Sequence, residues 1–202
     1  MVMSQSIDDQ VRNLCRAIDH GLRDWQDART SSLSVLKGLA NATIATSYLK
    51  DGGGSVRGGS DPHEARWRPG EENLRARLEV GLWTQRLANY QRLQTQLQRM
   101  EDAVDALRES LATLQGCSLP MREALGRSIN LLYLEELLVE AVGALTDEGI
   151  MCGDLVQKSG HATTQESQVL YASAWAALPL LQEHRRQALK DLVQVVLSGG
   201  EA

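Results

Sequence analysis

Apolar side chains recur at intervals of three and four residues along most of the chain, and the longest uninterrupted run lies in its middle. This alternation keeps one side of an α-helix apolar, so the run predicts a long helix with a heptad repeat. A heptad helix must pack its apolar seam against at least one other helix. The run consists of Tyr90, Leu93, Leu97, Met100, Val104, Leu107, Leu111 and Leu114.

Residues 1–50 predict an N-terminal helix, or two helices with a joint near residues 30–32. Ser6 followed by two aspartates is a typical helix start, because the hydroxyl caps the first turn and the acids face the positive end of the helix dipole. Trp25 lies on the apolar stripe and is most simply a core or interface aromatic. Its alternative role is an exposed binding anchor. The stripe consists of Ile7, Val11, Leu14, Ile18, Leu22 and Trp25.

Residues 51–70 combine clustered glycines with two prolines and predict a flexible Gly-rich linker. The spacing from Gly53 to Gly59 resembles a phosphate-binding loop only superficially, because Gly59 stands where that loop needs a lysine. Trp67 either docks on another surface or is simply part of the linker composition.

Residues 71–149 predict the long heptad helix, ending at Gly116, and a central helix over 121–148 that Gly149 closes. The central helix has two apolar stripes and therefore predicts neighbours on two sides. One stripe consists of Leu125, Ile129, Leu132 and Val139, and the other of Leu131, Leu134, Leu138, Ala141 and Leu145.

Residues 150–202 predict an irregular loop over 150–162 and then a pair of C-terminal helices. Thr163 and Glu166 have the spacing of a capping box for the first of these, and Pro179 ends or kinks it. The last helix is expected from about Leu180 to Leu197. Together the segments predict an all-α fold, an elongated antiparallel helical bundle with a long coiled-coil-like helix pair, forming one helical domain overall.

Composition narrows the function classes. The formal net charge of -5 does not favour direct nucleic-acid binding. The three cysteines are odd in number and widely spaced, which indicates a reducing compartment rather than a disulfide framework. Neither a signal peptide nor an apolar run long enough to cross a membrane is present in the sequence. We therefore expect a soluble intracellular protein that contacts neither nucleic acid nor membranes directly.

Catalytic and metal sites are not indicated. The four histidines lie in different segments, without the spacing that metal sites in helical bundles require. Cys152 and His161 share one segment and could pair as a thiolate and a base, but no third orienting group is evident, and structural roles are favoured. We expect no enzyme activity and no cofactor.

A family resemblance is carried by the C-terminal residues Tyr171, Ser173, Trp175 and Pro179, followed by Arg186 and Leu189. Their spacing resembles the C-terminal signature of the cyclin-dependent kinase 2-interacting protein family. The N-terminal helix, with Trp25 and then residues 38–41, is similar to the tryptophan-containing helix of that family. The rest of the chain matches in pattern and layout only.

The resemblance implies a nuclear, non-enzymatic adaptor in ribosome (pre-60S) biogenesis and in DNA replication and its checkpoint. The implied partners are an Afg2-type AAA+ ATPase and a small helical protein resembling the Afg2-interacting ribosome maturation factor. Cyclin-dependent kinase 2, Cdc7 kinase and ATR-ATRIP are further implied partners. The candidate contact residues are Trp25, Tyr171, Trp175, Pro179, Arg186 and Leu189.

Two alternatives remain open. The candidate contact residues can instead close the core of the bundle. The heptads taken alone favour a different class of protein, a structural coiled-coil subunit of a tethering or kinetochore-type complex.

Overall fold

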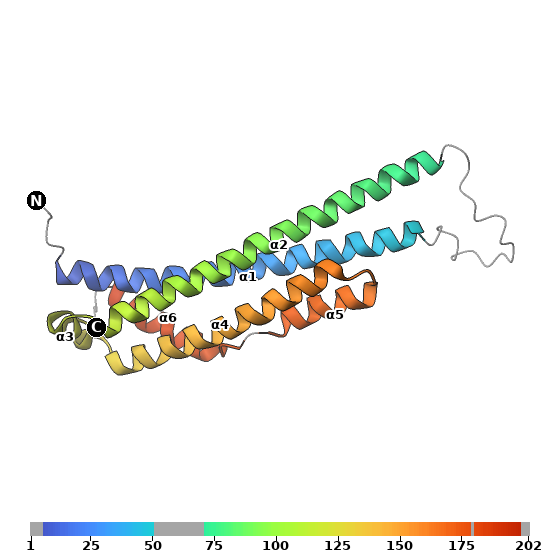
Figure 1. Cartoon of the computed structure of the whole chain (residues 1–202). Coiled ribbons are helices and arrows are strands. Elements are labelled where there is room, and N and C mark those ends of the chain that lie inside the picture. Colours follow the sequence, from blue (N-terminus) through green and yellow to red (C-terminus); the bar gives the residue numbers. More distant parts are fainter. Residues whose placement is uncertain (1–5, 51–70, 179, 199–202) are drawn as a thin grey trace, which may run out of the picture. The chain divides into compact units, whose positions relative to one another are not determined.

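A computed structural model describes residues 6–50, 71–178 and 180–198, and these ranges contain six α-helices and no strand (Figure 1). The predicted all-α helical bundle is confirmed, whereas the elongated shape and the coiled-coil pairing stay predictions. The predicted linker, Trp67 and Pro179 lie outside the described residues. The helices are α1 (Ile7–Lys50), α2 (Glu71–Gln115), α3 (Leu119–Ser128), α4 (Leu131–His161), α5 (Gln165–Ala176) and α6 (Glu183–Leu197).

The contacts between Cα atoms divide the chain into two compact units, to each of which α1, α2 and α4 contribute residues. The prediction of one helical domain overall stays a prediction. Unit 1 comprises the described residues of Met1–Arg29, Leu97–Met151 and Leu178–Ala202, and unit 2 those of Thr30–Gln96 and Cys152–Ala177.

The first helix is continuous and has no joint near residues 30–32. Ser6 caps it as predicted, since its hydroxyl accepts a hydrogen bond of 3.1 Å from the backbone N–H of Asp9. Small side chains keep the buried stripe unbroken after Trp25, because Ala28 and Ser32 are themselves buried and lead on to Leu36. The buried stripe of α1 therefore continues through the polar run that follows Trp25.

The buried seam of α2 follows the heptad d and g positions rather than the predicted a and d positions. All four d residues are buried, whereas Val104 is the one buried residue at the a positions from Tyr90 to Leu111. The g positions carry small or polar residues, and Asn89, Ala103 and Ser110 are buried there. The seam is thus one of large side chains alternating with small or polar ones.

The predicted central helix is in fact two helices, and Ile129 and Asn130 separate them. Ile129 has an extended backbone (φ -144°, ψ 161°), and the side chain of Asn130 accepts a 3.2 Å hydrogen bond from the N–H of Tyr133, capping α4. The break changes the helical phase. As a result, Leu132 and Val139 of the predicted first stripe are exposed.

The predicted loop over 150–162 is wrong, because α4 continues through it to His161. Cys152, Val156 and Ser159 are buried at helical spacing and continue the stripe of Leu145. Gly149 does not end the helix; a Cβ at this glycine would lie 3.5 Å from the Trp25 ring, an ordinary contact.

The two C-terminal helices are shorter than predicted. The cap of α5 is Thr164, whose hydroxyl accepts a 3.2 Å hydrogen bond from the N–H of Ser167, and not the predicted Thr163 and Glu166 box. The last helix begins at Glu183 rather than near Leu180. Its buried side chains are Leu189, Val193 and Val196.

Cys15 lies in the core of unit 1, and its burial raises the pKa of the thiol from 9.0 to about 11. As the pH rises, this thiol therefore ionises in the unfolded chain before it ionises in the folded protein. We therefore expect this group to lower the free energy of unfolding by up to about 3 kcal/mol as the pH rises from about 9 to 11. Denaturant unfolding of a Cys15→Ala variant should lack this part of the pH dependence, and Cys117→Ala, at a half-buried thiol, should retain it. Equal pH dependence in the two variants would contradict the assignment.

Unit 2 contains a close contact between α4 and α2. A Cβ at Gly160 would lie 2.5 Å from Cε2 of Tyr90, far inside contact distance. We expect Gly160→Ala to displace this ring and to lower the melting temperature. Gly81→Ala is the matched control, because Gly81 lies in α2 with nothing within 4 Å of its added Cβ, and alanine should stabilise that helix by about 0.5–1 kcal/mol. Stabilisation by both substitutions would show that the contact imposes no constraint.

Candidate interaction surface

Three of the predicted contact residues are core residues. Trp25 and Leu189 are buried in unit 1, and Trp175 is buried in unit 2. A partner would have to open the respective core to reach them. The interpretation of these residues as core is therefore favoured.

Of the other predicted contact residues, Arg186 and Tyr171 lie within the described ranges and belong to different units. Arg186 lies in unit 1, where its guanidinium donates hydrogen bonds to Gln26 of α1 and to Glu183 of α6. The bond from Arg186 lowers the pKa of the Glu183 carboxyl. Tyr171 is half-buried on α5 in unit 2. Arg186 thus links α6 to α1.

A buried carboxylate in unit 1 joins three segments, and sequence reasoning did not find it. Glu148 of α4 accepts a 2.5 Å hydrogen bond from Nε of Arg29 in α1 and a 3.3 Å bond from the N–H of Leu180. The glutamate is almost fully buried, so these donors take the place of water around its carboxyl group. This cluster holds the fold together and offers no open site.

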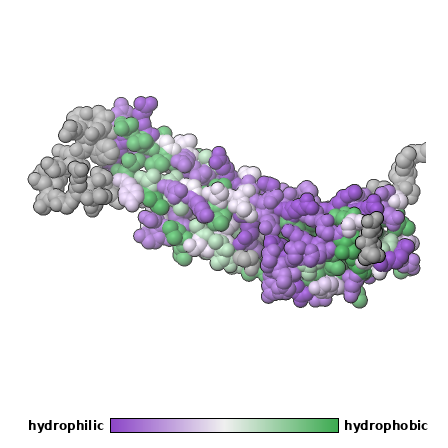
Figure 2. Space-filling view, turned by 180° about the vertical axis from the view of Figure 1, so that it is seen from behind, coloured by the Kyte–Doolittle hydropathy of each residue, from purple (hydrophilic) through white to green (hydrophobic). Residues whose placement is uncertain are grey.

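An exposed apolar stripe lies in unit 2, on the N-terminal half of α2. Val80, Trp83 and Leu87 are 65%, 64% and 41% exposed and lie at intervals of three and four residues, so they share one side of the helix. Single exposed apolar residues are common, but a contiguous row of them marks a contact site. Apolar surface is also visible over the end of α1 and the beginning of α2 on the face seen in Figure 2.

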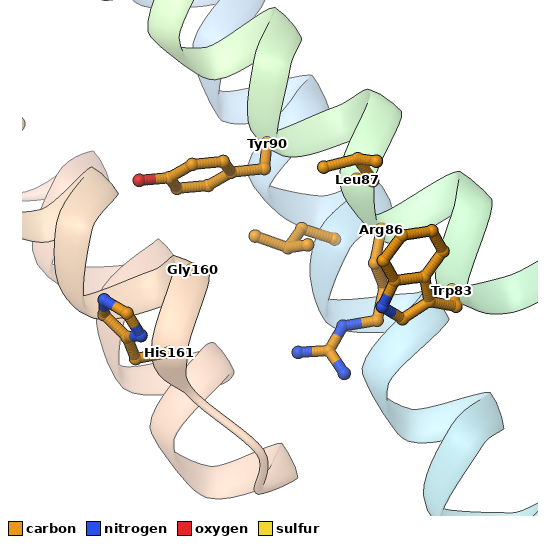
Figure 3. A pocket seen from close by; sticks show the side chains of 7 residues that line it. Trp83, Arg86, Leu87, Tyr90, Gly160 and His161 are labelled. Atoms are coloured by element: carbon orange, nitrogen blue, oxygen red, sulfur yellow. The ribbon is translucent and has the colours of Figure 1, made fainter.

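Two cavities open along this stripe, and Trp83 and Arg86 line both of them. One has a volume of about 240 Å³ and extends to α4, and the other, of about 330 Å³, extends to Thr46 of α1. Figure 3 shows Tyr90 reaching from α2 toward the segment of α4 that carries Gly160 and His161. We call the whole region the Trp83 surface: Leu39, Thr46, Glu79, Val80, Trp83, Arg86, Leu87, Tyr90, Gly160 and His161.

The Trp83 surface carries one arginine, Arg86, and one carboxylate, Glu79. Glu79 accepts a 3.0 Å hydrogen bond from Arg75, which offsets its charge. Arg86 donates a 3.1 Å bond to the carbonyl of Ala162, and within the described residues it forms no ion pair. This surface therefore suits an apolar partner with acidic groups at its edge.

Sequence reasoning missed Trp83, although a signal was present. Ala76, Val80, Trp83, Leu87 and Tyr90 continue the three-and-four spacing toward the start of α2. Which side of α2 becomes covered depends on where α4 and α5 end, and the sequence pattern of α2 carries no information about that.

Among the residues with described positions, no group of three His, Cys, Asp or Glu side chains is arranged to hold a metal ion. None of the helices in those same ranges is long and apolar enough to span a membrane.

We expect Glu148→Ala to destabilise the protein by about 2–4 kcal/mol, because it removes a buried carboxylate that accepts hydrogen bonds from Arg29 and from the Leu180 N–H. Glu140→Ala is the matched control on the same helix. Its carboxylate pairs with Arg185 at 3.4 Å in a half-exposed position, so its loss should cost less than about 1 kcal/mol. Denaturant unfolding of the full chain measures both, and equal losses would contradict the role of Glu148.

Comparison of the chain with models of protein families, with curated proteins and with solved structures found no match.

Proposed function

We propose that this chain is a non-enzymatic helical adaptor that binds a partner through the Trp83 surface. The observation that carries the proposal is the row of exposed apolar side chains beside two cavities on α2. A large indole exposed next to apolar pockets is costly in water and is typical of binding anchors. An adaptor needs such a surface on a stably folded scaffold.

The identity of the partner rests on the family resemblance of the C-terminal residues alone. On that basis we propose an Afg2-type AAA+ ATPase and a related small helical protein as partners. The process would be ribosome biogenesis and DNA replication maintenance, in the nucleus. Cyclin-dependent kinase 2, Cdc7 kinase and ATR-ATRIP are secondary partners in the same proposal.

The alternative is a structural coiled-coil subunit of a tethering or kinetochore-type complex, which the heptads of α2 support. A coiled-coil subunit must offer its seam to another chain. All four d residues of the heptad run and three of its four g residues are already buried, which weighs against this alternative. The two functions differ in a measurable property, because a coiled-coil subunit self-associates or binds along the length of α2.

The test is recovery of the purified ATPase, with and without the related helical protein, on the immobilised full chain. Val80→Glu places a charge on the Trp83 surface at an exposed position, so the fold should persist, and we expect ATPase recovery to fall at least about 10-fold. Gln85→Glu adds the same charge elsewhere on α2 at another exposed position and should leave recovery unchanged.

Cooperative thermal unfolding of both variants confirms that the scaffold is intact. Equal recovery by both variants would remove the Trp83 surface from the proposal. No recovery by the unmodified chain would overturn the ATPase as the partner.

A further inference from the structure

We propose that the Trp83 surface binds an amphipathic helix of another protein, which places apolar side chains along the α2 stripe and acidic side chains beside Arg86 and His161. This inference rests on the proposed function, since it takes the surface to be a protein contact. It adds the shape and the chemistry of the partner.

The shape follows from the way α4 is already accommodated in unit 2. Leu39 of α1, Tyr90 of α2 and Gly160 of α4 line one cavity, so these three helices meet there. α4 ends at His161, whereas α1 and α2 extend beyond that point (Figure 1). The same two helices that accept the end of α4 therefore continue without it, and a helical partner fits where a helix of the chain itself stops.

The length of the stripe also matches a helix. Val80 and Tyr90 are ten positions apart in α2, which corresponds to ~15 Å, or about three helical turns. Two cavities along this length can accept side chains from successive turns of a partner helix, at i, i+3 or i+4, and i+7. Trp83 lies between the cavities because it lines both.

The positive charge of Arg86 favours a partner helix with acidic side chains. Arg86 lines both cavities, and the exposed His161 lines the first. The one carboxylate of the surface, Glu79, is already paired with Arg75. Acidic residues on the partner would thus meet Arg86 without a competing carboxylate from the surface itself.

A second copy of this chain is a poorer occupant. In a two-fold dimer both copies present the same surface, so an acidic partner for Arg86 would have to come from Glu79, which is already paired with Arg75. The formal net charge of -5 per chain adds a weak repulsion between copies.

The experiment is a selection of displayed helical peptides of about 20 residues on the immobilised full chain, with the Val80→Glu variant used to remove peptides that bind elsewhere. We expect the enriched peptides to share an apolar stripe at i, i+3 or i+4, and i+7, with Glu or Asp at its edge. Enriched peptides without this periodicity, or an empty selection, would overturn the inference.

The charge preference is tested with one enriched peptide and its counterpart in which each acid is replaced by lysine. We expect the lysine peptide to bind at least about 10-fold more weakly, and Arg86→Gln to reduce this difference. The indole NMR signal of Trp83, assigned with Trp83→Phe, should shift on binding. Equal affinities of the two peptides, or binding without a shift of this signal, would contradict the assignment.

Two other occupants have distinct signatures. Dimerisation of the free chain that Val80→Glu abolishes would assign the surface to a second copy. An increase in the accessibility of Trp83 to a quencher in Trp67→Ser would assign it to residues 51–70 of the chain. Either result would overturn the inference, whereas a failure to recover the ATPase would not, because the selection uses no ATPase.

Discussion

Close approach of the helices to α2 is the constraint on which both units depend. In unit 1, a Cβ on Gly21 of α1 would lie 2.9 Å from Cγ of Leu107. In unit 2, a Cβ on Gly38 would lie 3.1 Å from Nδ2 of Asn89, and one on Gly160 would lie 2.5 Å from the Tyr90 ring. The chain contains no Phe and only 4% aromatic residues, so few large rings are available to fill its cores, and close approach at glycines adds contact area.

This packing explains why one side of α2 stays exposed to solvent. A seam of alternating large and small residues at the d and g positions lets neighbouring helices pack closely against α2. The side chains at those positions are then largely buried. The stripe that contains Val80, Trp83 and Leu87 lies to one side of the seam and becomes covered only where another helix is present. Tyr90, beside Gly160, is half-buried, whereas Trp83, seven residues earlier in α2, is 64% exposed. The Trp83 surface is thus a consequence of helix lengths.

The sequence predicted the all-α fold and the start of α1, because heptad spacing and a serine cap act locally and depend on few neighbours. It did not predict the break at Ile129 or the extension of α4 to His161. In both places the local signals conflict, since an isoleucine is a poor stop signal and Gly149 a common one, and tertiary burial decides. The Trp83 surface was missed for a related reason. Its stripe has the spacing of a buried seam, and only the end of α4 leaves it exposed.

Trp175, one of the residues that carry the family resemblance, lies in the same unit as the Trp83 surface but does not line it. Trp175 is buried in unit 2 and anchors α5, and the amide of Gln168 on the same helix donates a 2.8 Å hydrogen bond to the carbonyl of Ser159 in the last turn of α4. These contacts bind α5 to the end of α4, so the chain leaves α2 at His161 instead of continuing along it. Arg86 of α2 also holds the segment after α4, because it donates a hydrogen bond to the carbonyl of Ala162. Trp175 can therefore matter for the proposed partner binding without touching the partner, because the contacts of α5 hold the end of α4 and so affect how much of α2 stays exposed.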